Sequence, residues 1–106
     1  MSGVDVVTLF DGTFSSTSPV TSDFVSISDE RDSVTLFVCP TNVNLVYDIQ
    51  FEDPNGNWHV FDGGLSVNDG DCHAEVIPFN PGRMRIVMTP SAGSGSAIAW
   101  SRASGA

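Results

Sequence analysis

The segment that decides the fold is residues 43–52, VNLVYDIQFE, followed by DPNGN at 53–57 and WHVF at 58–61. Proline presets φ and Asn-Gly accepts positive φ, so 53–57 is the strongest turn signal in the chain and 58–61 is expected to return as a paired strand. Apolar side chains at every second position of the first segment predict a β-strand with one buried face, formed by Val43, Leu45, Tyr47, Ile49 and Phe51.

The same period of two recurs along the chain, and helical periodicity is absent. Alternating segments lie at 4–10, 24–28, 33–39, 83–88 and 97–101, and polar turns or Gly/Ser loops at 29–32, 80–82 and 90–96 separate several of them. Asp11-Gly12 is expected to form a hairpin turn, with 13–15 as a return strand. About eight or nine short strands and no substantial helix predict an all-β, antiparallel β-sandwich, either Ig-like or jelly-roll-like.

The length of 106 residues fits one domain, expected over 1–101, with 102–106 as a short flexible tail. Residues 13–22, rich in Ser and Thr, are expected to form a surface loop that is ordered only by contact with a partner. Residues 1–5 lack the basic and apolar regions of a signal peptide. No apolar run approaches the roughly 20 residues of a membrane span, so no membrane partner is expected.

The charge balance is strongly acidic: the net charge is −9, from 13 acids against 4 arginines and no lysine. Such a surface repels phosphate backbones, so nucleic-acid binding is not expected. Two explanations for the acids stay open. Aspartates mark the turns of a turn-rich protein, or the chain is halophilic and its self-repulsion is screened in high salt.

Groups that would carry chemistry are sparse. A bridge between Cys39 and Cys72 is conceivable but cannot be derived from their spacing, and reduced thiols are the expectation without an export signal. Cys72 and His73 are adjacent, so on a strand they point to opposite faces and do not share a metal. The Asp-rich segments 53–57 and 69–71 lack the calcium-loop pattern and are expected to be turns. No metal, no cofactor and no enzymatic activity are predicted.

Several strands carry apolar or basic residues on the face expected to point outward. On a two-sheet sandwich these are candidates for contact with another chain, although the apolar ones would also fit positions under loops and the arginines would also fit solvated positions. The candidate partner contacts are Phe37, Val46, Phe61, Arg83 and Arg85. Exposed aromatic rings would alternatively form a sugar-binding platform, but core packing accounts for most of the rings.

The strand–turn–Trp run at 45–58 resembles small β-sandwich virion structural proteins of tailed bacteriophages and tailed archaeal viruses. The opening segment 6–13, the strand 24–27 and the Pro-Gly turn before Arg83 are similar to theirs. The turn is entered through Glu52-Asp53-Pro54, where those proteins usually have Ser-Asp.

The resemblance implies a non-enzymatic capsid decoration or turret subunit that is synthesised in the host cytoplasm and stabilises the capsid surface. Its partners would be the major capsid protein or other virion proteins, and shell symmetry favours a homo-oligomer, a trimer or pentamer. The alternatives are a carbohydrate-binding or adhesion module and a tail or connector component.

Overall fold

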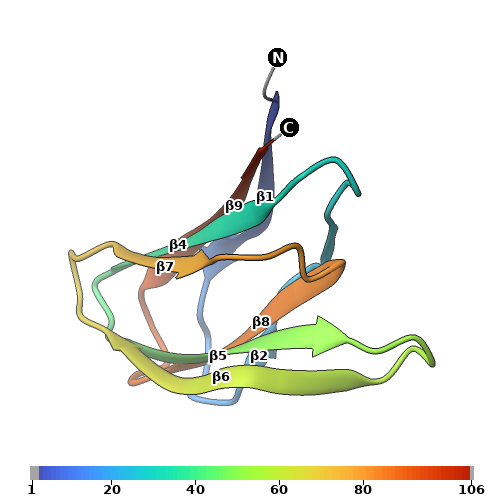
Figure 1. Cartoon of the computed structure of the whole chain (residues 1–106). Helices are drawn as coiled ribbons and strands as arrows, with labels where there is room; N and C mark the ends of the chain where they lie inside the picture. The colour runs from blue at the N-terminus through green and yellow to red at the C-terminus, as the bar shows by residue number, and fades with distance from the viewer. Residues whose placement is uncertain (1–2, 106) are drawn as a thin grey trace.

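Nine strands and no helix make up the computed structural model, which describes residues 3–105 (Figure 1). They form two packed antiparallel sheets, so the predicted all-β sandwich is confirmed. No segment within 3–105 is a helix long and apolar enough to cross a bilayer. The strands are β1 (Gly3–Thr13), β2 (Val20–Thr21), β3 (Val25–Ser26), β4 (Ser33–Thr41), β5 (Leu45–Glu52), β6 (Trp58–Val67), β7 (His73–Ile77), β8 (Arg83–Pro90) and β9 (Ser96–Gly105).

The two sheets lie one above the other in Figure 1. The first, sheet 1, has the strand order β1-β9-β4-β7; the second, sheet 2, has the order β2-β8-β5-β6, and β3 also pairs with β8. Alternate residues of both sheets point into the space between them, as the period of two predicts. The largest side chains buried there include Leu9, Leu36, Leu45, Tyr47, Ile49, Ile77, Met84, Ile86 and Met88.

The β5–β6 hairpin forms where the sequence predicts it. Glu52 pairs with Trp58, and the Asp53 carboxylate closes the turn by accepting backbone N–H bonds of 2.9 Å from both Asn55 and Asn57. The turn therefore uses its aspartate as a structural acceptor, the role expected of turn-forming Asp. Its other carboxylate oxygen lies 2.7 Å from His59 Nε2, and this hydrogen bond lowers the pKa of Asp53.

The predicted hairpin turn at Asp11-Gly12 is wrong. β1 continues straight through these residues, because Asp11 pairs with Ile98 and Gly12 with Ala97 of β9. A long neighbouring strand thus satisfies the backbone groups that a local turn would have satisfied. The chain leaves sheet 1 only after Thr13 and then crosses to sheet 2.

Residues 13–22 are held by the protein itself, which differs from the expectation of a loop ordered only by a partner. Phe14 is buried and stacks on Phe10, with ring centroids 5.6 Å apart. Ser22 is also buried, and its Oγ accepts a 3.0 Å hydrogen bond from the Ile86 N–H. β2, between these two anchors, pairs with β8.

The C-terminal boundary also differs from the expected one. Residues 102–105 belong to β9, where Ala103 is buried and pairs with Asp5 on one side and Val34 on the other. A small polar sequence forms a strand here because β9 lies between β1 and β4, which supply backbone partners on both edges. Of the expected flexible tail, Ala106 lies outside the described residues.

Cys39 and Cys72 form a disulfide, so the expectation of reduced thiols is wrong. The antiparallel register of β4 and β7 explains the bond: Val38 pairs with His73, and one step further along places the two cysteines opposite each other, with Cα atoms 4.2 Å apart. Sequence spacing does not report this register. The bond ties β7, an edge strand, to the interior of sheet 1.

Candidate functional site

The five predicted partner contacts do not form one site. Phe37 lies on the outer face of sheet 1, half-buried and stacked on Trp100 with ring centroids 4.9 Å apart. Arg83 and Arg85 of β8 and the exposed Val46 of β5 share the outer face of sheet 2. Only the two arginines lie close together, because Val46 is near the opposite end of the sheet from them.

Phe61 is placed by a β-bulge. Val60 pairs with Gln50 and Asp62 with Ile49, which leaves Phe61 as the extra residue between them. Its ring stacks on Phe51, with centroids 4.5 Å apart. The side chain is 48% exposed and packs on Phe51, which is itself partly buried against the core.

An arginine–aromatic patch occupies one end of the outer face of sheet 2. Its charged groups come from neighbouring strands whose pairing sets their order: β8 lies between β3 and β5, and β6 follows β5. Gln50 pairs with Arg85 across β5 and β8, and Glu52 pairs with Trp58 across β5 and β6. The patch consists of Phe24, Gln50, Glu52, Trp58, Arg83 and Arg85.

Both arginines in the patch lie against aromatic rings. The Arg85 guanidinium carbon is 4.3 Å from the Trp58 ring centroid, and its Nε donates a 2.7 Å hydrogen bond to Gln50 Oε1. The Arg83 guanidinium is 5.1 Å from the Phe24 ring. Each contact is worth about 0.5–1 kcal/mol at an exposed position and restricts the guanidinium to one orientation.

The two arginines differ in how far their charge is neutralised. Arg83 Nη1 lies 3.3 Å from Glu52 Oε1, so its charge is shared with a carboxylate of the patch. Arg85 hydrogen-bonds to a neutral amide, and among the described residues no carboxylate lies within salt-bridge distance of it. Arg85 is therefore a fixed and unneutralised positive charge on an acidic protein, and its remaining N–H groups suit a carboxylate from another molecule.

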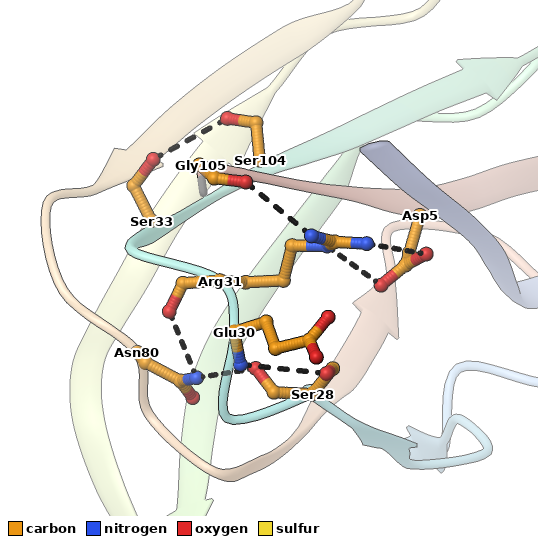
Figure 2. Close-up of polar contacts among 8 residues, drawn as sticks. All are labelled: Asp5, Ser28, Glu30, Arg31, Ser33, Asn80, Ser104 and Gly105. Carbon is orange, nitrogen blue, oxygen red and sulfur yellow. Dashed lines mark hydrogen bonds and ion pairs between the residues drawn. The ribbon is translucent and has the colours of Figure 1, made fainter. Parts of the chain in front are cut away.

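Arg31 has a different role, shown in Figure 2. Its Nε donates to Asp5 Oδ2 at 2.9 Å and its Nη1 to the Gly105 carbonyl at 3.3 Å, which ties residues at both ends of the chain together. The hydrogen bond with Asp5 raises the pKa of Arg31. The Asn80 amide donates to the carbonyls of Ser28 and Arg31, and this fixes the loop that carries the arginine. Arg31 is thus a structural group.

The histidines and the acidic loops have partners of their own. No group of three or more His, Cys, Asp or Glu side chains within residues 3–105 is arranged to hold a metal ion. In the second acidic segment, Asp69 Oδ1 accepts a 2.7 Å hydrogen bond from the Asn42 N–H, which fits a turn. His73 Nδ1 lies 2.6 Å from the buried Tyr47 hydroxyl, and burial raises the pKa of Tyr47.

Arg83 and Arg85 were predicted from the sequence as partner contacts, but the residues that orient them were not predicted. Trp58 had a usable signal, because the Asn-Gly turn places it opposite Glu52 and so fixes which face it occupies. Phe24 had none, since its place beside Arg83 depends on the pairing of β3 with β8.

Together, fold and patch define the class of protein: an antiparallel two-sheet sandwich with an arginine–aromatic surface on one outer face. Solved structures that share the fold include two prophage proteins and one virus protein. At 12–14% identity the likeness concerns the fold alone.

The PBSX exported protein XepA is similar with a TM-score of 0.71 and 13% identity, over 96% of this chain and 37% of that one. The SPBc2 prophage-derived protein YomS has a TM-score of 0.62 and 12% identity, over 98% of this chain and 95% of that one. The VP2 subviral particle of infectious bursal disease virus has a TM-score of 0.62 and 14% identity.

The chain corresponds to nearly the whole of YomS but to only 32% of VP2 and 37% of XepA. No protein-family model matches the sequence, and no curated protein matches it.

Proposed function

We propose that this chain is a virion structural protein that attaches to a neighbouring virion protein through the arginine–aromatic patch. The observation that carries the proposal is Arg85, whose charge is fixed by Trp58 and Gln50 and is not neutralised within the molecule. An oriented guanidinium loses little rotamer entropy when it forms a two-bond contact with a carboxylate. The fold shared with prophage and virus proteins supports the same role.

In its more specific form, the proposal is a capsid decoration or turret subunit located on the capsid surface. The partner is then an acidic segment of the major capsid protein, and repeated symmetric sites on the shell favour a trimer or pentamer of this chain. In a tail or connector, the arginine–aromatic patch of this chain would bind a different virion protein.

The test uses virions of the virus that carries the gene. The protein should be present in purified particles, and an antibody against it should label the shell; label confined to the tail would support the connector alternative. Purified protein added to shells lacking it should bind, and Arg85→Ala should weaken binding at least about tenfold. Arg102→Ala removes an equal charge from the opposite face and should leave binding unchanged when both proteins are compared at a concentration where they are monomeric. Absence of the protein from particles would contradict the proposal.

A second function, carbohydrate binding, is favoured by one observation: Phe24 is 51% exposed and lies beside Trp58, with ring centroids 6.0 Å apart. The Arg85 guanidinium covers one face of Trp58, which reduces the flat aromatic area that a sugar ring would need. Retention on a glycan array that is lost in Trp58→Ala would favour this function over the virion role.

A further inference from the structure

The outer face of sheet 1 differs from the rest of this acidic molecule. Its exposed or half-buried side chains come from all four strands and are nearly all uncharged: about half are apolar, and most of the others are Ser or Thr. We call this surface the neutral face; it includes Val6, Thr8, Phe37, Val76, Ile98 and Trp100. Val6 and Val76 are among its most exposed residues, at 63% and 65%, and they lie on the two edge strands.

Charge is nearly absent from this face. Among the described residues whose side chains alternate with the buried ones on β1, β9, β4 and β7, Asp11 is the only acid and Arg102 the only base. The face is therefore neutral, although the whole chain carries a net charge of −9. Two such chains repel each other in most orientations, and the repulsion is smallest where two neutral surfaces meet.

We infer that copies of this chain associate through the neutral face. This inference rests on the proposed function, from which the expectation of self-association comes; two copies that meet neutral face to neutral face are related by a two-fold axis, so this contact makes a pair, whereas the trimer or pentamer on the shell needs a different contact. Asp11 and Arg102 support the neutral-face contact: Asp11 pairs with Ile98, four residues from Arg102 on β9, so the two charges lie roughly 14 Å apart along the strands. An offset between copies brings the arginine of one against the aspartate of the next.

The size of the face suits such a contact. Four strands about 4.8 Å apart, of which β1, β9 and β4 have about five outward rows and β7 about two, give a surface on the order of 500 Å² per copy, so a pair would bury about 1,000 Å². That is the lower limit for a specific association between proteins. The arginine–aromatic patch lies on the opposite side of the sandwich, so contact with another copy leaves it free for a different partner (Figure 1).

The experiment is a native-mass measurement by light scattering, in dilute buffer and in molar salt, over concentrations up to about 1 mM. The wild-type protein should exceed the monomer mass, and the mass should rise with salt because salt screens the repulsion between acidic chains. Association through the arginine–aromatic patch would instead weaken in salt, so a mass that falls with salt overturns the inference.

Matched variants locate the contact. Val76→Asp and Val6→Asp each place a charge in the neutral face and should raise the dissociation constant at least about 100-fold. Val60→Asp makes the same change at a position 55% exposed on sheet 2 and should leave the mass unchanged. Melting temperatures show whether all three variants remain folded. The inference would also be overturned by a wild-type monomer under every condition, or by loss of association in Val60→Asp alone.

The shell-binding experiment separates the two proposals. A monomeric wild-type protein that still binds shells through Arg85 would overturn the neutral-face contact and leave the proposed function standing. A protein that associates through the neutral face but is absent from virions would overturn the proposed function and leave the neutral-face contact standing.

Discussion

Removing the disulfide between Cys39 and Cys72 should destabilise the protein strongly. The bond joins β4 to Cys72, the residue directly before β7, and β4 is the only strand that pairs with β7 among the described residues. Without the bond, β7 is held by its pairing to β4 and by the burial of Ile77. The double variant Cys39→Ala/Cys72→Ala tests how much the cross-link contributes.

The expected loss follows from the length of the closed loop. The two cysteines are 33 residues apart in the sequence, and chain-entropy arithmetic for such a loop gives about 3.7 kcal/mol at 25 °C. For a domain of this size that loss lowers the melting temperature by on the order of 15 °C. Because the cross-link also keeps the unfolded chain compact, the denaturant m-value should be larger in the double variant.

Urea denaturation of the oxidised protein and of the double variant measures the difference. Reduction with dithiothreitol should bring the wild-type protein to the stability of the variant and leave the variant unchanged. Equal stabilities before reduction would refute the reasoning. Two free thiols in the unfolded, unreduced wild-type protein would refute the disulfide itself.

Three further predictions concern local contacts. Gly95 has φ +87°, and a Cβ there would lie 2.7 Å from a buried valine side chain, so Gly95→Ala should lower the free energy of unfolding by about 2–3 kcal/mol. Gly56 has φ +86° but open space around it, so Gly56→Ala should lower the free energy of unfolding by only about 1 kcal/mol. Equal losses of the two variants in urea denaturation would contradict this prediction. Tyr47→Phe removes the 2.6 Å hydrogen bond to an imidazole and should cost about 1 kcal/mol by the same assay, whereas unchanged stability would show that the bond contributes nothing. The hydrogen bond from His59 lowers the pKa of Asp53. The stabilising effect of this hydrogen bond is therefore present above the ordinary pKa of the carboxyl and is lost as the pH falls through the folded-state pKa. A carboxyl NMR titration should show the lowered pKa of Asp53, and His59→Ala should return that pKa toward its ordinary value.

Local sequence signals predicted the strands well, because alternation and turn chemistry act over a few residues. The hairpin from Leu45 through the Asn-Gly turn to Trp58 is the clearest case, since pattern and turn agree on one register. The same signals failed at Asp11-Gly12. There the dipeptide favours a turn, but pairing with the distant β9 supplies more backbone hydrogen bonds than a local turn would.

Bulges limit what alternation predicts about individual side chains. One extra residue in β6 moves Phe61 out of the simple in–out order and places it against Phe51, while its neighbour Val60 takes the outward position. Nothing in the sequence of β6 marks where the extra residue falls. The disulfide depends in the same way on the register of β4 and β7, which pair although β5 and β6 lie between them in the sequence.

The different distribution of charged side chains on the two outer faces depends on which strands share a sheet. Arg83 and Arg85 were predicted to point outward, but the Arg85 guanidinium is held in one orientation only because Trp58 and Gln50 lie on neighbouring strands. Conversely, Val6 and Val76 are 70 positions apart in the sequence and share one nearly uncharged face only because β1 and β7 flank β9 and β4. Strand order, which no local pattern encodes, therefore places charge on one face and removes it from the other. A molecule built in this way has one surface suited to an acidic partner and another on which acidic copies repel each other least.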